Sequence, residues 1–433
     1  MFLFPNLCTV CIHKGDMSSR DRGTPMHVNA VHEAGPFLVI GACGFLGSHI
    51  CRTLHSQGRK TVVLVRSSNL NPQISMIPLT VKISPVIDED VLNDVLFEVC
   101  KGYIAGIFHV AGCVKHTTNS ADVAEMRLAN VDLSSIIFEF ATKHGIRVVY
   151  ASSSGVVGCQ FLEDKLRVAH DDSPLCTSSS DMFPYYKQKS EVELLWRPRA
   201  LQCQAPIIFL RPSLLLGPGD ERLSSTQIVL QLIRKKVPFL VQGGISFVDV
   251  RDVAAAFIEA MLSGEVTLGT AMNLTAANCS IREFAELVAK YTGVPAPSFA
   301  LPSSVARIGG RLLNTYHELM QEGKDSLTDP VVVEMGQRYW NVSCQRAVDL
   351  IDFEPRECRE TIVDTAQYLY NTFGEGDAVQ SPVQQNSCEG HSSERWKAAG
   401  RKRPSTPFFR RGNIVRLLCF LLVVVLCVAM LLL

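Results

Sequence analysis

The sequence has no excess of charge of either sign. Its 42 lysines and arginines balance 42 aspartates and glutamates, so the formal net charge at neutral pH is zero. No basic stripe runs through the body of the chain, and such a stripe is the electrostatic footprint of a nucleic-acid binder. We therefore expect no nucleic acid among the partners of this protein.

The sequence also lacks a cysteine framework. Its 15 cysteines are scattered through apolar segments, whereas small secreted domains space their cysteines as a disulfide scaffold. Cys8 and Cys11 form a CxxC pair, but neither a second CxxC pair nor a histidine pair at zinc spacing accompanies them. We predict reduced cysteines and no metal site.

Charged side chains are absent from residues 417–433, which read LLCFLLVVVLCVAMLLL. At about 1.5 Å of rise per residue, a helix of this length reaches roughly 25 Å, which just spans a thin bilayer such as that of the endoplasmic reticulum. A buried core helix is the weaker interpretation, because the run is apolar on all sides. We predict a transmembrane tail anchor over residues 413–433, in the endoplasmic reticulum membrane.

Basic residues precede the apolar run 417–433 of this anchor, and none follows it. The positive-inside bias then keeps the body of the protein in the cytosol. The basic side chains before the anchor are Arg395, Lys397, Arg401, Lys402, Arg403, Arg410, Arg411 and Arg416.

Two further segments have little folding potential. Residues 375–412 are rich in Gly, Ser, Gln and Pro and then basic, so they cannot bury enough apolar surface to fold. We predict a flexible linker there. Residues 1–35 form an N-terminal extension that begins with an apolar stretch but has no basic n-region, and Pro5 interrupts it. A signal peptide is therefore disfavoured.

The body of the chain, residues 36–374, has ample apolar content for a large core. Short β-branched apolar runs alternate with amphipathic segments of helical length, a pattern typical of an α/β protein with a parallel sheet covered on both faces. We predict strands over 37–41, 61–65, 104–110, 147–151 and 206–210. Helices are expected over 48–57 and 121–143, the second ending at Gly145 as a left-handed cap.

A glycine-rich turn, GACGFLG over residues 41–47, follows the first predicted strand and opens the first predicted helix. Gly41 permits the tight turn, Gly44 lets the backbone approach a pyrophosphate, and Gly47 lets the helix pack on the strand. The start of the helix would then face the phosphates. Three spaced glycines alone are a weak signal, but their position in a first βαβ unit favours a dinucleotide site.

The second predicted strand ends at Arg66, where an NAD site carries an acid for the ribose diol. Arginine there favours a 2′-phosphate, and Ser67 and Ser68 can donate to the same group. We therefore expect NADP rather than NAD, although a solvated arginine at a strand end is the alternative interpretation.

Tyr185 and Lys189 lie at positions i and i+4 and would share one face of a helix. A phenol with a pKa of about 10 is a poor base at neutral pH, and a lysine ammonium one turn away lowers that pKa. A tyrosine packed over a lysine stem is the structural alternative. The serine run upstream, within RVVYASSSGVVG (147–158), favours catalysis.

Over residues 36–374 the sequence resembles the extended branch of the short-chain dehydrogenase/reductase superfamily. Within it, FHVAG is similar to the dihydroflavonol reductase and 3β-hydroxysteroid dehydrogenase groups. Seven motifs carry the resemblance, in this order: GACGFLG (41–47), FHVAG (108–112), ANVD (129–132), VVYASSSGVVG (148–158), YYKQK (185–189), LRPSLLLGPG (210–219) and FVDVRDVAAA (247–256).

The resemblance implies an interleaved Rossmann fold, with cofactor binding mainly in 36–212 and substrate binding mainly in 213–374. It implies Tyr185 as general acid/base, Lys189 as the ligand of the nicotinamide ribose, and Ser153 as the hydrogen-bond partner of the substrate oxygen, with Ser152 and Ser154 as substitutes. It also implies a homodimer paired through helices. The implied cofactor contacts are Gly41, Gly44, Phe45, Leu46, Gly47, Arg66, His109, Ala111, Gly112, Tyr185, Lys189 and Pro212.

The sequence differs from its relatives at positions that bear on the type of reaction. No acidic pair follows Ser153, so this chain lacks the acids that the related dehydratases use. Leu214 replaces the asparagine that sugar epimerases use. Leu214 and its neighbours indicate either an apolar substrate wall or a buried strand. The strand after Leu79 lacks the Gly-Asp that relatives use near adenine, which weakens the cofactor assignment.

Together these observations predict an NADP(H)-dependent oxidoreductase that interconverts a secondary alcohol and a ketone. Its substrate would be a small lipophilic molecule, sterol- or isoprenoid-like, at the cytosolic face of the membrane. An NAD(P)-dependent epimerase is the first alternative, because the same residues can oxidise and re-reduce one substrate. A membrane-tethered dinucleotide-binding protein without catalysis is the second.

Overall fold

The computed structural model describes residues 35–158, 166–175, 182–237, 239–310 and 329–374. The predicted linker (375–412), the predicted anchor (413–433) and nearly all of the N-terminal extension lie outside these residues. Within the described part of the chain, no helix combines the length and the apolar character that a membrane span requires.

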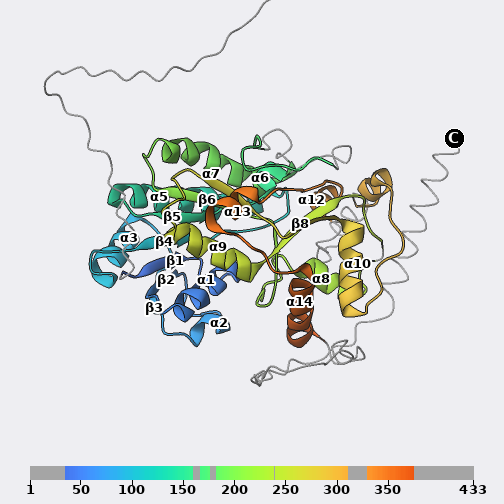
Figure 1. Cartoon of the computed structure of the whole chain (residues 1–433), viewed down its shortest axis with the longest axis horizontal. Coiled ribbons are helices and arrows are strands. Elements are labelled where there is room, and N and C mark those ends of the chain that lie inside the picture. Colours follow the sequence, from blue (N-terminus) through green and yellow to red (C-terminus); the bar gives the residue numbers. More distant parts are fainter. Residues whose placement is uncertain (1–34, 159–165, 176–181, 238, 311–328, 375–433) are drawn as a thin grey trace, which may run out of the picture.

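A parallel seven-stranded sheet forms the centre of the molecule (Figure 1). Its strands run in the order β3-β2-β1-β4-β5-β6-β9, so the order reverses between β1 and β4. In a doubly wound sheet, this reversal opens a crevice at the carboxyl ends of the strands, where ligands bind. The bounds are β1 Phe37–Ile40, β2 Thr61–Val65, β3 Thr80–Ile83, β4 Gly106–His109, β5 Val148–Ala151, β6 Ile207–Pro212 and β9 Ala271–Leu274.

Helices cover both faces of this sheet, as the continuous apolar strands require. One face packs against α1 (Phe45–Ser56) and α9 (Val250–Leu262). The other packs against α3 (Glu89–Asp94), the π-helical turn η1 (Val95–Val99), α5 (Leu133–His144) and α7 (Pro184–Leu201). Every residue of β1 is buried, because alternate side chains enter these two cores.

A second, three-stranded sheet lies beyond the carboxyl end of β6. Its order is β10-β8-β7, formed by β7 Leu214–Leu216, β8 Gly244–Asp249 and β10 Ala277–Ser280. It shares a core with α8 (Gln227–Ile233), α10 (Ile281–Thr292) and α14 (Cys358–Phe373), which group at one end of the molecule in Figure 1. Shorter helices in the described part are α2 Pro72–Ser75, α6 Gly155–Gly158, α12 Pro330–Met335 and α13 Gln345–Ile351.

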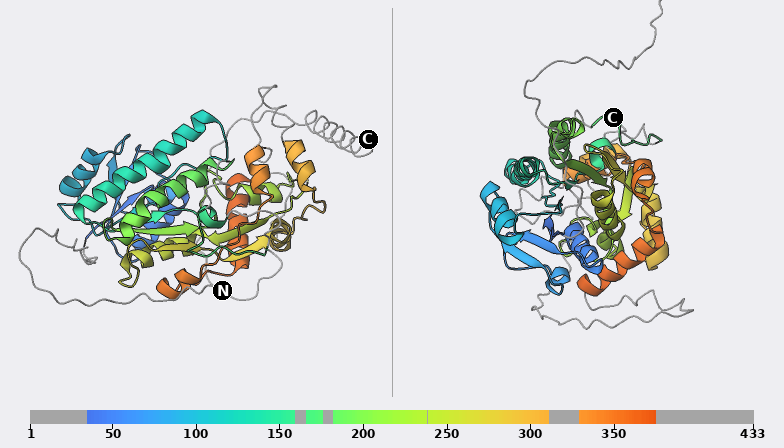
Figure 2. Two further views of the ribbon diagram at one scale, coloured as in Figure 1. Left: turned by 90° about the horizontal axis from the view of Figure 1, so that it is seen from above. Right: turned by 60° about the vertical axis from the view of Figure 1, so that its left-hand side comes forward.

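Every strand that the sequence analysis expects is present, shifted by no more than three residues at either end. The helix expected over 121–143 is instead three consecutive pieces: α4 (Ser120–Arg127), a π-helical turn η2 (Leu128–Asp132) and α5. Helix α5 ends at Gly145 with φ of 65°, the left-handed cap expected there. The rod from α4 to α5 lies beside α7, as Figures 1 and 2 show.

Candidate active site

The glycine turn is shaped as its spacing predicts. Gly41 has φ of +101°, and a Cβ there would lie 2.5 Å from the backbone nitrogen of Ala111, at the end of β4. A Cβ on Gly47 would lie 2.1 Å from the carbonyl oxygen of Gly41, so α1 packs on the turn only because position 47 has no side chain. Gly44 begins α1 in an extended conformation.

The start of α1 fits a pyrophosphate. No side chain caps it and its first turn holds no acidic residue, so its backbone N–H groups and the positive end of the helix dipole remain available. Gly44, Phe45 and Leu46 all line the large cavity of the molecule. These features match the phosphate site of a dinucleotide.

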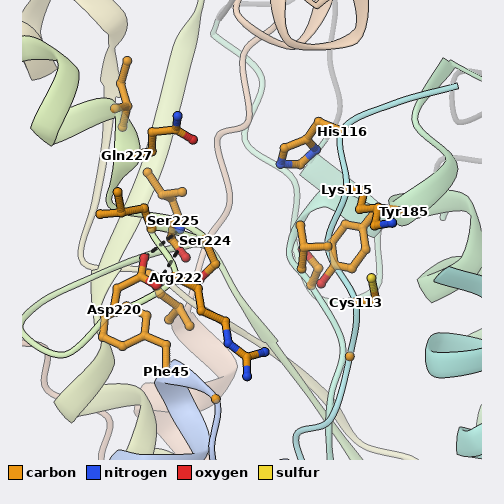
Figure 3. A pocket seen from close by; sticks show the side chains of 18 of the residues that line it. Phe45, Cys113, Lys115, His116, Tyr185, Asp220, Arg222, Ser224, Ser225 and Gln227 are labelled. Atoms are coloured by element: carbon orange, nitrogen blue, oxygen red, sulfur yellow. Dashed lines mark hydrogen bonds between the residues drawn. The ribbon is translucent and has the colours of Figure 1, made fainter. Parts of the chain in front are cut away.

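This cavity has a volume of about 3250 Å³ and extends from the glycine turn to the small sheet. Ala111, Gly112, Pro212 and Arg66 line it, as do Tyr185 and Lys189. Figure 3 shows Phe45, Asp220 and Arg222 on one side of the cavity and Cys113, Lys115, His116 and Tyr185 on the other. One cavity therefore joins the predicted phosphate site to the predicted acid/base.

Like Gly47, His109 is a predicted cofactor contact that does not line the cavity. Its side chain is fully buried and does not line the cavity. Its Nε2 pairs with the hydroxyl of Ser134 at 2.9 Å, and its ring packs against Phe138 and Tyr150. Burial, with a smaller contribution from the charge of the nearby Lys189, lowers the pKa of His109 to about 3. His109 is therefore a neutral core residue behind the cavity wall, and its contact with the cofactor stays a prediction.

Arg66 lies at the carboxyl end of β2, exposed and on the cavity. Among the described residues it forms no ion pair or hydrogen bond. Ser67 lines the cavity beside it. A free guanidinium next to a hydroxyl is suited to a phosphate monoester.

Tyr185 and Lys189 share one face of α7, as the i, i+4 spacing predicts. The Nζ of Lys189 lies 6.0 Å from the centre of the Tyr185 ring, and it donates to the hydroxyl of Tyr150 at 3.0 Å and to the carbonyl of Ala151 at 2.7 Å. Tyr150 therefore holds the ammonium against the carboxyl end of β5.

The protonation of this pair differs from the expectation. Burial lowers the pKa of Lys189 to about 7, while Glu193 acts to raise it. Burial raises the pKa of Tyr185 above its usual range. The lowered tyrosine pKa that the sequence predicts is therefore not present in this structure, because both groups lie in a desolvated wall.

The three serines after β5 have different surroundings. Ser152 is buried, and its hydroxyl donates to Glu193 at 2.5 Å. Ser153 is partly exposed on the cavity, where its oxygen accepts a long 3.3 Å bond from the backbone N–H of Gly155. Ser154 is buried, although it too borders the cavity. Ser153 is the serine best placed to donate to a ligand.

A buried ion pair behind these serines escaped the sequence analysis. Arg211 on β6 and Glu193 on α7 are both fully buried and bonded through two guanidinium nitrogens. A further guanidinium nitrogen donates to the carbonyl of Asp171 at 2.8 Å. The only signals were Glu193 at four residues after Lys189 and Arg211 inside an apolar strand, and neither identifies its partner.

Asn130 also escaped the analysis, although it lies in the ANVD motif. It projects from the π-helical turn η2 and bonds both the backbone N–H and the carbonyl of Cys113 at 2.9 Å. Its amide nitrogen also donates to Gln188 of α7 at 3.0 Å. The extra residue in the helical turn thus aims Asn130 at the loop that follows β4.

This loop places His116 beside the acid/base. The ring centre of His116 lies 6.5 Å from that of Tyr185, in an edge-on arrangement. Lys115 fixes the loop through ion pairs with Asp122 at 2.7 Å and Glu125 at 2.6 Å, both on α4. Burial lowers the pKa of His116, so its imidazole is neutral at pH 7.

The far part of the cavity is lined by apolar side chains of the small sheet and its helices, together with charged ones such as Arg222, Arg234 and Lys235. Leu214 and Leu215 of β7 are partly exposed on it, whereas Leu216 enters the core of the small sheet. Leu216 therefore belongs to a buried strand, whereas a substrate wall at Leu214 and Leu215 stays a prediction. Other apolar lining residues are Ile228, Ile245, Phe284 and Trp340.

Comparison with known proteins agrees with this arrangement. The model of a family described as the NAD dependent epimerase/dehydratase family matches residues 37–274. A putative dihydroflavonol 4-reductase of Synechocystis sp. is 30% identical over 273 residues, covering 61% of this chain and 75% of that protein. Sterol demethylase protein B of Methylococcus capsulatus is 25% identical over 270 residues, covering 61% and 77%.

A solved structure shares the fold. A nucleoside-diphosphate-sugar epimerase from Pseudomonas aeruginosa superposes with a TM-score of 0.62 at 16% identity, covering 78% of this chain and 98% of that one. At this identity the similarity concerns the fold alone.

Proposed function

The chain belongs to the NAD-dependent epimerase/dehydratase family and is an NAD(P)-dependent oxidoreductase, and on that premise we propose that it interconverts a secondary alcohol and a ketone on a lipophilic, sterol- or isoprenoid-like substrate. One observation carries the proposal. Tyr185 and Ser153 face the same cavity, and that cavity extends to apolar side chains of the small sheet and its helices. The similarity to a protein named sterol demethylase protein B supports the substrate class.

The chemistry follows from these side chains. When bound, the nicotinamide cofactor supplies or accepts the hydride at the carbon. For ketone reduction, the hydroxyl of Tyr185 gives its proton to the substrate oxygen, and Ser153 donates a hydrogen bond to the same oxygen. For alcohol oxidation the proton moves in the opposite direction. The charge of Lys189 favours the tyrosinate that reduction leaves behind.

NADP(H) is the proposed cofactor because Arg66 and Ser67 stand free at the end of β2. NAD remains the competing cofactor, and affinity measurements decide between them. The Arg66→Gln variant should lose affinity for NADPH and keep its affinity for NADH. Equal losses would assign Arg66 to a group that both cofactors share.

The proposed location is the cytosolic face of the endoplasmic reticulum membrane, through the tail anchor at 413–433, with the protein as a homodimer. The apolar run 417–433 and the basic residues before it support the location. Membrane fractionation of cells that produce either the full chain or a chain lacking 417–433 tests this location. A truncated chain that still cofractionates with membranes contradicts the anchor.

The test of the reaction uses the full chain in detergent with a lipid extract and either NADP or NADPH. Mass spectrometry should find a lipid whose mass changes by one hydride plus one proton. Tyr185→Phe should abolish this change and leave cofactor affinity nearly intact. Tyr186→Phe, at the neighbouring tyrosine on the same cavity, is the matched control and should keep turnover.

Two results oppose the proposal. Turnover retained in Tyr185→Phe removes this residue from the proton transfer. A lipid that is isomerised without a change of mass, by a protein that retains its cofactor, favours the epimerase instead.

A further inference from the structure

A short loop between β7 and α8, residues 217–226, is held in one conformation by an internal carboxylate. Asp220 is buried, and its oxygens accept from the backbone N–H groups and hydroxyls of Ser224 and Thr226 at 2.9 to 3.0 Å. Gly217 and Gly219 take φ of +125° and +105°, where a side chain is strained. The loop is therefore rigid.

This loop, although it belongs to the second half of the chain, is fastened to the helix that begins at the glycine turn. The Nε2 of His49, on α1, pairs with the carbonyl of Pro218 at 2.9 Å. Gly219 lies so close to Gln73, on α2, that a Cβ would come within 2.1 Å of its amide nitrogen. Burial lowers the pKa of His49 to about 4, so the neutral imidazole donates this bond across the physiological range.

Arg222 projects from this rigid loop into the cavity, and Figure 3 shows its guanidinium extending into the open space. The side chain is exposed, and among the described residues it forms no ion pair or hydrogen bond. Arg234, another arginine of the same cavity, differs because it donates to the carbonyl of Phe373. Arg222 thus carries a positive charge on the cavity that no ion pair or hydrogen bond among the described residues engages, although the carboxylate of the adjacent Glu221 interacts with it electrostatically.

We propose that Arg222 binds the pyrophosphate of the dinucleotide cofactor, from the side of the cavity that also holds Phe45 at the start of α1 (Figure 3). The uncapped N–H groups of α1 reach only one side of a pyrophosphate, and both they and Arg222 face the same cavity. A planar guanidinium can bind two phosphate oxygens at once. The second half of the chain would thereby complete a site that the glycine turn begins.

The proposal rests on the use of a dinucleotide and not on the lipophilic substrate. Cofactor affinity is therefore measured without substrate, by fluorescence titration of the full chain in detergent with NADH, NADPH and ADP-ribose. Arg222→Gln should weaken all three by a similar factor, about 10- to 100-fold, since all three carry the pyrophosphate and the lost bonds are charge-assisted. Adenosine 2′-phosphate, which has no pyrophosphate, should bind as before.

Three variants sharpen the test. Arg222→Lys keeps the charge but not the paired donors, so its loss should be smaller. Arg66→Gln should weaken NADPH and adenosine 2′-phosphate only, and Arg234→Gln should change no affinity. Because Arg222 is exposed, its variants should melt at the same temperature as the parent protein.

Other outcomes overturn the proposal. Unchanged affinity for ADP-ribose in Arg222→Gln removes Arg222 from the pyrophosphate. Loss confined to NADPH would place the residue at the 2′-phosphate. A raised KM for the substrate with unchanged cofactor affinity would assign Arg222 to an anionic group of the substrate.

Discussion

At the scale of the residue, burial gives Ser152 and Ser153 different roles. The hydroxyl of Ser152 donates a hydrogen bond to the buried carboxylate of Glu193, whereas the hydroxyl of Ser153 faces the cavity. Neighbours on one strand end point to opposite sides, which is why adjacent serines meet such different partners.

Alanine substitutions should separate the two serines. Ser153→Ala should lower kcat by about 10²-fold, as expected for loss of one donor to the substrate oxygen, with little change in stability. Ser152→Ala should instead lower the free energy of unfolding by about 1–3 kcal/mol, because Glu193 loses a buried donor. Steady-state kinetics and urea unfolding of both variants measure this, and the reverse pattern would make Ser152 the substrate-binding serine.

The pKa of Lys189 predicts how stability varies with pH. Burial lowers this pKa to about 7, so between about pH 7 and the ordinary lysine pKa of about 10.4 the unfolded chain binds a proton that the folded chain does not. Stability contributed by this site therefore rises with pH across that window. Lys189→Met should flatten the rise, as followed by urea unfolding at pH 7, 8 and 9.

The exposed Lys187, two residues earlier on the same helix, supplies the control for this experiment. Lys187→Met should leave the slope unchanged, because it removes an exposed side chain and keeps the buried Lys189 in place. An unaltered slope in Lys189→Met would show that Lys189 keeps an ordinary pKa in the folded protein.

At the scale of the element, one ion pair joins α7 to β6. Arg211→Met or Glu193→Leu alone should cost about 3–5 kcal/mol, because each leaves an uncompensated buried partner. The double variant Arg211→Met, Glu193→Leu should cost less than the sum of the two single changes. Denaturant unfolding over this double-mutant cycle measures the coupling, and additive costs would exclude a strong pair.

The packing of α1 on the glycine turn gives a second prediction at this scale. Gly47→Ala should weaken cofactor binding and lower stability, since the new Cβ would lie 2.1 Å from the carbonyl of Gly41 and α1 must shift. Gly264→Ala, at a position where a Cβ meets nothing within 4 Å, is the matched control. Isothermal titration with cofactor and thermal unfolding measure both, and equal behaviour of the two variants would show that the turn tolerates a side chain.

Elements with a local pattern were predictable from the sequence. The five expected strands and the glycine turn depend on runs of apolar residues and on nearby glycines, which are local properties. The π-helical turn η2 was not predictable, because the pattern of 121–143 has the period of an ordinary helix. The burial of His109 and the pairing of Glu193 with Arg211 depend on contacts distant in sequence, which no local pattern shows.

The site was predictable to the same degree. Tyr185, Lys189 and Ser153 follow from short motifs, and the structure brings all three to one cavity. No recognisable motif spacing marked Arg222 or Asn130 as part of the site. Their positions depend on a carboxylate-capped loop and on a π-helical turn.

At the scale of the whole molecule, the chain passes repeatedly between its two sheets. Strand β6 of the large sheet continues after Ser213 into β7 of the small one, and the chain later returns through β8 and α9 to β9, an outer strand of the large sheet. The segments 36–212 and 213–374 are therefore interleaved in space, although their predicted boundary lies between Pro212 and Ser213.

This connectivity opposes a hinge motion within the described part of the chain. Several segments cross between the two sheets, and one of them is an almost uninterrupted strand, so a rotation that separates the sheets would strain all of these segments together. A ligand would instead enter through movements of side chains and short loops at the cavity entrance, while the two sheets keep their relative positions. Substrate specificity would then be set by the fixed width of the cavity entrance and not by the closure of one domain on the other.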